Sequence, residues 1–279
     1  MLSMQQLGFI GTGSMGSILL ESFIKAGIPE EMIHVTNRSV EKVRNIKTKF
    51  KHVSDHSSSR SLADSAEWIF VCTKPADMVG VLKDMSTYLK SHHVIITITS
   101  PLQVEEAEEL LYKTKTPVVR FIPSIVNLSL QGPSLVTFGN RCSNRLQNEL
   151  NQLFNLISSP ISITADMTRA ASDLASCGPA FISFLVRQMI KGAVEETGIK
   201  EGTALKITES MLVAYGELLR GKQFDLATLQ KRVTVPGGVT GVGLDVLEKN
   251  TKNTFHDMFK ATHKKYANDR DHIRELLNK

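Results

Sequence analysis

The sequence predicts an α/β fold, with an N-terminal parallel sheet and covering helices in residues 1–164 and an all-α C-terminal domain in residues 165–279. Short apolar runs alternate with amphipathic helical stretches as far as Ile157, which is typical of consecutive βαβ units. The first apolar run ends in a glycine-rich turn that leads into a helix. From about Met167 onward we find no convincing strand pattern, and long helical stretches take over.

The glycine-rich turn lies in Leu7–Gly16, which reads LGFIGTGSMG. Its spacing G-x-G-x-x-G, between an apolar strand and an amphipathic helix, is the pattern of a Rossmann-type dinucleotide site. The first glycine permits a tight turn, the second lets a pyrophosphate approach the backbone, and the third lets helix and strand pack closely. An ordinary βα turn without a ligand has the same spacing. We expect cofactor contacts, at the helix N-terminus, from Gly11, Thr12, Gly13, Ser14, Met15 and Gly16.

A second strand is expected at Ile33–Thr36, and Asn37, Arg38 and Ser39 follow it. A site that prefers NAD places Asp or Glu here, against the ribose 2′-hydroxyl, and that acid is absent. An arginine with small hydrogen-bonding neighbours suits a 2′-phosphate, because a guanidinium binds phosphate with paired hydrogen bonds. We therefore expect NADP(H) as the cofactor, with NAD(H) as the alternative if Arg38 is only a solvated loop residue.

The other strands and helices of the N-terminal domain follow in alternation. Trp68–Cys72 is a continuous apolar run, as expected of a buried parallel strand, and Thr73, Lys74 and Pro75 come directly after it. Because strand ends face the ligand crevice in such sheets, this loop is expected to make a second cofactor contact. The remaining predictions are helices at Val40–Phe50, Ala76–Leu89, Glu105–Tyr112 and Leu146–Ile157, strands at Val94–Ile98, Val118–Ile122 and Leu135–Phe138, and a loop at Ser54–Arg60.

The C-terminal domain is expected to consist of helices. Phe181–Thr197 is helical and apolar almost all round, which indicates burial within a bundle or between the subunits of a homodimer. Glu201–Leu219 is expected to form a second helix and Gly241–Glu248 to begin a third. The charged tail, Lys260–Lys279, is expected to form a solvated terminal helix.

Two clusters rich in glycine and proline interrupt the helical domain, at Ala175–Phe181 and Thr234–Thr240. Each precedes a predicted helix, so each is expected to offer backbone N–H groups at a helix start. Such N–H groups can hold a carboxylate without any basic side chain. The clusters therefore indicate a small carboxylate substrate, although two helix-capping turns would give the same pattern.

Composition restricts the other classes of function. The 279 residues are 42% hydrophobic and 22% charged, which is a normal soluble composition. No run approaches the ~18 apolar residues of a membrane span, and the N-terminus lacks the basic region of a secretion signal. The 3 cysteines are far apart and form no metal-binding spacing, so we expect a cytoplasmic, disulfide-free protein without a metal site. The net charge of +5 comes from scattered basic residues, which argues against nucleic-acid binding.

Several segments together resemble the pyrroline-5-carboxylate reductase family, over nearly the full length of the chain. The two in the helical domain are the most specific, and they distinguish this family from other Rossmann-type reductases. The segments are GFIGTGSMG at Gly8–Gly16, VTNRS at Val35–Ser39, TKP at Thr73–Pro75, RFIP at Arg120–Pro123, SCGPAF at Ser176–Phe181 and VTVPGGVTGVGLDVLE at Val233–Glu248.

The resemblance implies NAD(P)H-dependent reduction of Δ1-pyrroline-5-carboxylate, a small imino acid, to L-proline in proline biosynthesis. It also implies an interlocked homodimer, often assembled further, in which helical domains are exchanged. By resemblance, the Thr240 hydroxyl positions the ring nitrogen or relays a proton to it. The N–H groups around Gly237, Gly238 and Thr240 would hold the carboxylate, and Ser176, Cys177 and Gly178 would line the opposite side of the substrate.

The sequence departs from the family pattern at the substrate end. Ser124 stands where the family has an asparagine, Val235 where it has a serine, and Val239 where it has a threonine. A site built for hydrogen bonds loses much of its function when they are removed, because buried partners then go unpaired. The substrate would then be a related imine or keto acid, or the protein would bind cofactor and do little chemistry. A protein that binds cofactor and does little chemistry would resemble a divergent late-competence branch of bacilli, with a regulatory role.

A hydroxyacid dehydrogenase with the same architecture is a further alternative. Such enzymes use a lysine as acid and base on the helix that faces the nicotinamide. Lys191 lies on the apolar helix but well past the place where that lysine should be, which disfavours this alternative.

Overall fold

The computed structural model describes residues 5–279, which pack as two compact units. The sheet unit comprises the chain up to Pro179 together with Thr262–Lys279, and the helical unit comprises Ala180–Ala261. The sequence places the domain boundary after residue 164, whereas the compact units part at Pro179. The difference arises because residues 165–179 pack on the sheet, where the Ser176 hydroxyl donates a hydrogen bond to the Pro123 carbonyl oxygen at 2.7 Å.

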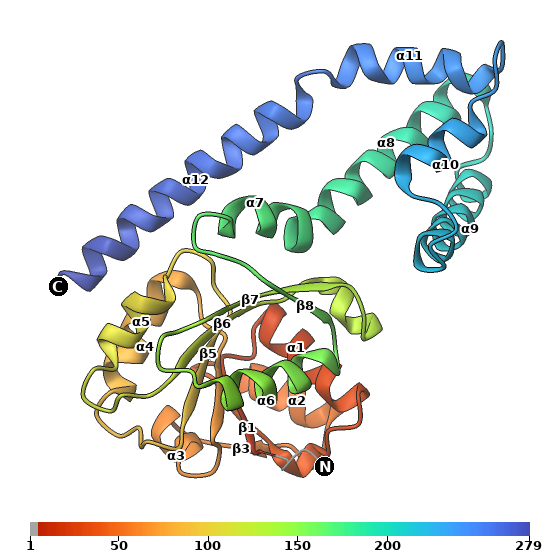
Figure 1. The fold of residues 1–279 in the computed structure, drawn as a ribbon. Helices are drawn as coiled ribbons and strands as arrows, with labels where there is room; N and C mark the ends of the chain where they lie inside the picture. The colour runs from red at the N-terminus through yellow and green to blue at the C-terminus, as the bar shows by residue number, and fades with distance from the viewer. Residues whose placement is uncertain (1–4) are drawn as a thin grey trace. The chain divides into compact units, whose positions relative to one another are not determined.

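Among the described residues, eight strands form one sheet in the order β3-β2-β1-β4-β5-β6-β7-β8 (Figure 1). Neighbouring strands are parallel except β6 and β7, which are antiparallel. The α/β prediction and its parallel sheet are therefore confirmed for β1 to β6. The strands are β1 (Leu7–Ile10), β2 (Ile33–Thr36), β3 (Ser54–Asp55), β4 (Trp68–Val71), β5 (Val94–Thr97), β6 (Val118–Ile122), β7 (Pro133–Phe138) and β8 (Ser159–Ser162).

The helices of the sheet unit cover both faces of the sheet. Successive strand residues alternate between two cores, as the strand geometry requires. Phe70 packs with Phe9, Phe23 and other residues in one core, whereas its neighbour Ile69 packs in the other with residues such as Leu82. The first core takes side chains from α1 (Ser14–Lys25), α2 (Val40–Lys49) and α6 (Asn144–Asn155), and the second from α3 (Ser59–Ala63), α4 (Pro75–Met85) and α5 (Val104–Leu110).

Two parts of the sheet unit differ from the prediction. The stretch Ser54–Arg60, predicted as a loop, contains β3 and the start of α3, and this prediction is wrong in part. The edge strand β8 was not expected, because its sequence SPIS is short and mostly polar. Short turns at Glu30–Met32 (η1) and Ile125–Ser129 (η2) complete the connections.

The remaining helices begin beside the sheet and continue through the helical unit. They are α7 (Thr168–Ser172), α8 (Gly178–Thr197), α9 (Glu201–Arg220), α10 (Leu226–Val233), α11 (Val239–Thr251) and α12 (Thr254–Leu277), with a π-helical turn η3 (Asp173–Cys177) between α7 and α8. The expected helical C-terminal domain is confirmed, whereas α7 and α10 were not expected. Within residues 5–279, no helix has the length and apolar character needed to span a membrane.

The end of α12 belongs to the sheet unit and is fixed to it by charged and apolar contacts. Two guanidinium nitrogens of Arg270 contact the two carboxylate oxygens of Glu106, at 2.6 and 2.7 Å. Ile273 is 1% exposed and joins the core beside α4 and α5. The tail is therefore helical, as expected, but this part of it is not simply a solvated surface helix.

Candidate functional site

The three glycines of the turn after β1 have three different surroundings. Gly11 adopts a φ of +99°, and its N–H donates to the Thr36 carbonyl oxygen at 2.8 Å, so the turn is tight and tied to β2. A Cβ atom on Gly16 would lie 2.1 Å from the Gly11 carbonyl oxygen, which forbids any larger residue there. A Cβ atom on Gly13 would meet nothing within 4 Å. Space is thus left open beside Gly13, at the position where a dinucleotide fingerprint requires room for a ligand.

The N-terminus of α1 is open to an anion. Gly13 is its N-cap, no side chain caps it, and its first turn contains no acidic residue. The first N–H groups of an α-helix have no partner within the helix, and the helix dipole places partial positive charge there. Ser14, Met15 and Gly16 form this first turn, so the structure brings the predicted phosphate-binding residues together in one anion-binding geometry.

The loop after β2 contacts the glycine turn through side chains. The Asn37 side-chain nitrogen donates to the Thr12 hydroxyl at 2.8 Å, and the Asn37 side-chain oxygen accepts from the Ser39 backbone N–H at 3.2 Å. Arg38 projects into solvent and forms an ion pair with Asp77, at 2.8 Å between Nη2 and Oδ2. Asp77 was not among the residues expected from the sequence, although an acid in the first turn of a helix that follows a strand end could have indicated it.

The loop after β4 lies against the same turn. The Cys72 N–H donates to the Ile10 carbonyl oxygen at 2.8 Å, and a Cβ on Gly11 would lie 2.9 Å from the Cys72 carbonyl oxygen. The Thr73 hydroxyl oxygen is buried and has no hydrogen-bond partner among the described residues. Lys74 is the N-cap of α4 and Pro75 begins it. This loop therefore borders the glycine turn, as predicted, and holds one polar atom that a ligand could satisfy.

A helix, α8, does begin within the cluster at Ala175–Phe181, at Gly178, but it continues a preceding helical turn, so the expected free helix start is absent. The chain is helical from Thr168 through the π-helical turn at Asp173–Cys177 into α8. Pro179 supplies no N–H, and its ring would collide with the carbonyl four residues earlier in a regular helix, so a widened turn accommodates it. The N–H groups of Ser176, Cys177 and Gly178 are consequently not those of a free helix start.

The π-helical turn carries a buried charged network. Arg169 Nη2 donates to Asp173 Oδ1 at 2.7 Å and to Cys177 Sγ at 3.5 Å. The Thr262 hydroxyl, from α12, donates to Asp173 Oδ2 at 2.7 Å. The Asp173 side chain is fully buried, so these contacts fix the turn and with it the position of Ser176 and Cys177.

The cluster at Thr234–Thr240 does begin a helix, as predicted. Gly237 adopts a φ of +72°, and the Gly238 N–H closes a turn onto the Val235 carbonyl oxygen at 3.0 Å. Gly238 is the N-cap of α11, and Thr240 lies in its first turn. No side chain caps this helix and no acid lies in its first turn, so its first N–H groups can bind a carboxylate.

Arg120, expected from the sequence only as part of its motif, is a buried structural residue. It is 0% exposed, in the middle of β6, and burial lowers the pKa of its guanidinium. Its donors reach the hydroxyls of Thr168 at 2.7 Å and Thr137 at 3.1 Å, and the Gln103 side-chain oxygen at 3.1 Å. Arg120 therefore ties the start of α7 to the sheet and holds the π-helical turn near the end of β6. A single charged residue inside the otherwise apolar strand VVRFI could have indicated that Arg120 is buried and hydrogen-bonded.

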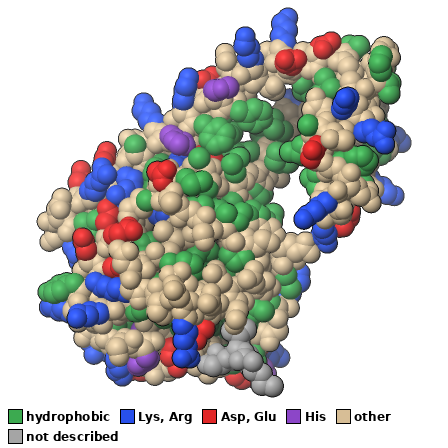
Figure 2. All heavy atoms as spheres, viewed as in Figure 1, with side chains coloured by type: hydrophobic (Ala, Val, Ile, Leu, Met, Phe, Trp, Pro, Cys, Tyr) green, Lys and Arg blue, Asp and Glu red, His purple; other side chains and the backbone are tan. Residues whose placement is uncertain are grey.

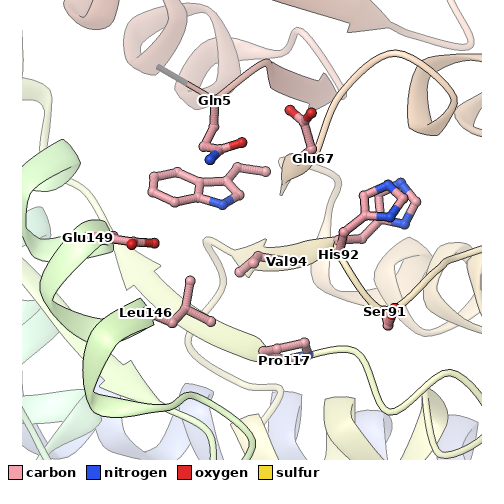
Figure 3. Close-up of a pocket in the computed structure, with 10 residues that line it drawn as sticks. Gln5, Glu67, Ser91, His92, Val94, Pro117, Leu146 and Glu149 are labelled. Carbon is pink, nitrogen blue, oxygen red and sulfur yellow. The ribbon is translucent and has the colours of Figure 1, made fainter. Parts of the chain in front are cut away.

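A pocket of about 400 Å³ lies at the end of the strands opposite to the glycine turn (Figure 3). Glu67 directly precedes β4, Val94 begins β5 and Pro117 directly precedes β6, so the pocket lies at the amino ends of these strands. Glu149 also lines it and is already bonded to Arg145 at 2.9 Å. Doubly wound sheets bind ligands at the carboxyl ends of their strands, so this pocket is separate from the predicted cofactor site.

Comparison with known proteins gives two family matches. A model of the pyrroline-5-carboxylate reductase dimerisation domain matches residues 165–269. A model described as NADP oxidoreductase, coenzyme F420-dependent, matches residues 6–101. The first description names dimerisation as the role of the matched domain in that family.

Two curated relatives from Bacillus subtilis (strain 168) match almost the whole chain. ComE operon protein 4 is 43% identical over 266 residues, covering 95% of this chain and 96% of that protein. Pyrroline-5-carboxylate reductase 3 is 26% identical over 267 residues, covering 94% and 96%.

Solved structures show the same fold. The Plasmodium falciparum pyrroline carboxylate reductase with NADP bound has a TM-score of 0.84 and 24% identity, covering 97% of this chain and 99% of that one. A pyrroline-5-carboxylate reductase from Coxiella burnetii has a TM-score of 0.81 and 22% identity, covering 98% and 99%. The dimerisation-domain match and the two curated relatives, together with this shared fold, show that the chain belongs to the pyrroline-5-carboxylate reductase family.

Proposed function

We propose that this protein is an NADP(H)-dependent reductase that converts Δ1-pyrroline-5-carboxylate to L-proline. The observation that carries the proposal is the turn at Gly11–Gly16, where the backbone is open beside Gly13 and leads into an uncapped helix. The name of the 26% identical relative and the name of its family supply the substrate. NAD(H) is the alternative cofactor.

The residues at the carboxyl ends of β1, β2 and β4 fit a phosphorylated dinucleotide. The first turn of α1 would hold the pyrophosphate, and Arg38 would hold a 2′-phosphate with a charge-assisted hydrogen bond. The unpartnered Thr73 hydroxyl is available to a further polar group of the ligand. When bound, the nicotinamide supplies the hydride that reduces the imine carbon.

The substrate is proposed to bind through its carboxylate. The first N–H groups of α11, after Gly237 and Gly238, would hold the carboxylate oxygens. The Thr240 hydroxyl would hydrogen-bond the ring nitrogen and hold or relay the proton that completes the amine. Ser176, Cys177 and Gly178 would line the substrate site, at the junction of the π-helical turn with α8.

A homodimer, or a larger assembly of dimers, is proposed as the working form. Figure 2 shows hydrophobic side chains gathered over the helical unit. In α8 alone, Ile182, Phe184 and Met189 are each more than half exposed. An apolar surface of this extent is typical of a permanent interface, and a second copy of the chain is its proposed partner.

The loss of NADPH absorbance upon addition of pyrroline-5-carboxylate tests the proposal directly. We expect turnover by the purified protein, and Thr240→Val should lower kcat about 100-fold while leaving the Kd for NADPH unchanged. NADPH binding is measured separately by nicotinamide fluorescence. Binding without any turnover would contradict the reductase proposal while leaving the cofactor site intact.

A regulatory, catalytically weak protein is the second candidate. It is favoured by 43% identity to ComE operon protein 4, against 26% to a protein named as a reductase. Ser124, Val235 and Val239, which replace polar residues of the family pattern, favour it as well. The variant S124N/V235S/V239T separates the candidates. A gain from no turnover to measurable turnover selects the regulatory protein, whereas turnover by the unaltered chain selects the reductase.

A further inference from the structure

Arg38 and Asp77 form an ion pair that joins two loops of the sheet unit. Arg38 Nη2 lies 2.8 Å from Asp77 Oδ2. Arg38 follows β2, and Asp77 lies in the first turn of α4, which follows β4. Since β2 and β4 lie on either side of β1, the ion pair joins the loops that flank the glycine turn.

The exposure of this ion pair makes it easy to open. The Arg38 side chain is 84% exposed and the Asp77 side chain 35% exposed. An ion pair with this much access to water is weak, because solvent and salt screen the attraction between its charges. An anion that binds Arg38 more strongly can therefore replace the carboxylate.

We propose that Asp77 competes with the 2′-phosphate of the cofactor for Arg38 and so sets the preference between NADP(H) and NAD(H). This inference rests on the proposed dinucleotide function. A phosphate that binds Arg38 must either displace the Asp77 carboxylate or lie close to it, and both weaken binding. The 2′-hydroxyl of NAD(H) carries no charge and does not need Arg38, so Asp77 leaves its binding unchanged.

The location of Asp77 explains why it is held in this position. Its carboxylate lies in the first turn of α4, where the helix dipole favours negative charge. Arg38 is held by its own loop, in which Asn37 is bonded to both Thr12 and Ser39. The two charges are therefore positioned by separate elements before any ligand binds.

Dissociation constants of NADPH and NADH, measured by nicotinamide fluorescence, test this inference without relying on turnover. The substitution Asp77→Asn keeps the size of the side chain and removes its charge. We expect the Kd for NADPH to fall about fivefold and the Kd for NADH to change by less than about twofold. Asp84→Asn, on the same helix, is the matched control, because Asp84 is bonded to Tyr88 and should change neither value.

A double mutant identifies the partner of Asp77. In an Arg38→Ala background, Asp77→Asn should give no gain in NADPH affinity, because the competition no longer exists. Equal changes for both cofactors, no change for either, or a gain that persists without Arg38 would overturn the inference. Failure of the unaltered protein to bind either cofactor would instead overturn the proposed function, and the inference with it. Circular dichroism confirms that each variant is folded.

Discussion

The sheet unit and the helical unit differ in where their apolar side chains lie. In the sheet unit, β1, β2, β4, β5 and β6 are buried along their whole length. In the helical unit, α10 and α11 have no buried residue, and α8 has only Ile190. Both units contain regular secondary structure, but only the sheet unit supplies its own core. We therefore expect the helical unit, unlike the sheet unit, to obtain apolar contacts from another chain.

This difference divides the proposed site. The proposed phosphate-binding residues, from Gly11 to Gly16, are supported by a core that the chain completes alone. Gly237, Gly238 and Thr240 belong to the helical unit and depend on whatever covers its apolar surface. We therefore expect cofactor binding to survive loss of the assembly, and substrate turnover to be lost with it.

A charge on the exposed apolar face of α8 should give the largest effect, a loss of dimerisation. Phe184 is 59% exposed on α8, and Phe184→Asp would place a charge in the proposed interface. The two copies in a dimer would together lose about 4 kcal/mol of apolar burial, so the dimer Kd should rise about 1,000-fold. Size-exclusion chromatography with light scattering measures the mass, and NADPH fluorescence measures the retained cofactor site.

Tyr112→Asp is the matched control for this substitution. Tyr112 is 64% exposed in the sheet unit, so its replacement should change neither the mass nor cofactor binding. A Phe184→Asp protein that stays dimeric would show that the exposed face of α8 is not the interface. Loss of NADPH binding in a folded monomer would show that the two units are not independent in the way proposed.

Two glycines of the same turn should differ in what their substitution changes: Gly16 the stability of the fold, and Gly13 the binding of the cofactor. Gly16→Ala would place a methyl group 2.1 Å from the Gly11 carbonyl oxygen, so backbone must shift and stability should fall by about 3 kcal/mol. Gly13→Ala has free space and a φ of −72°, which alanine adopts readily, so stability should be nearly unchanged. The Kd for NADPH should nevertheless rise at least about tenfold, because the methyl group occupies the ligand's space.

Urea unfolding and NADPH fluorescence separate these two effects. Gly80→Ala, a position in α4 that also has free space, controls for a methyl group added elsewhere in the sheet unit. Normal NADPH binding by the Gly13→Ala protein would contradict the proposed position of the pyrophosphate. Unchanged stability in the Gly16→Ala protein would contradict the close packing that assigns Gly16 to the fold.

The sequence was most informative where burial and periodicity coincide. Buried strands such as WIFV at Trp68–Val71 have apolar side chains on both faces, and this pattern is visible without a structure. Strand β3 has only two residues, Ser54 and Asp55, neither buried, and β8 is mostly exposed. Such edge strands form because a neighbouring strand offers hydrogen bonds, and their own residues carry no signal of it.

The proposed site also contains parts that the local sequence predicts and parts that depend on distant residues. The spacing of Gly11, Gly13 and Gly16 predicted three local geometries that the structure now describes, and their contacts with a ligand stay a prediction. Pro179 could be recognised as incompatible with a regular helix interior, yet the local sequence does not distinguish a new helix from a widened turn. The choice depends on distant partners, including the bond from Thr262 to Asp173 and the bond from Ser176 to Pro123. Asp77 was missed for the same reason, since its partner lies 39 residues away.

A histidine pair at the edge of the sheet unit should give the smallest effect. His34 Nε2 lies 2.9 Å from the Gln6 side-chain oxygen, which only accepts, so this nitrogen carries a proton. His34 Nδ1 must then accept from His56 Nε2, also at 2.9 Å. Burial, and then the neighbouring His56, lower the pKa of His34 below its ordinary value of 6.5. Burial also lowers the pKa of His56, against the opposing charge of Asp55.

Acid should therefore weaken the sheet unit through this pair. Below about pH 6.5 the unfolded chain binds protons that the native pair does not, so stability falls as the pH falls. A second proton on His34 would oppose the N–H of His56 and break a hydrogen bond worth about 1 kcal/mol. Urea unfolding at pH 7.5 and pH 5 measures the loss. His34→Gln should flatten this pH dependence, whereas replacement of the exposed His52 by glutamine should not. An equal slope in both variants would assign the acid sensitivity to groups other than this pair.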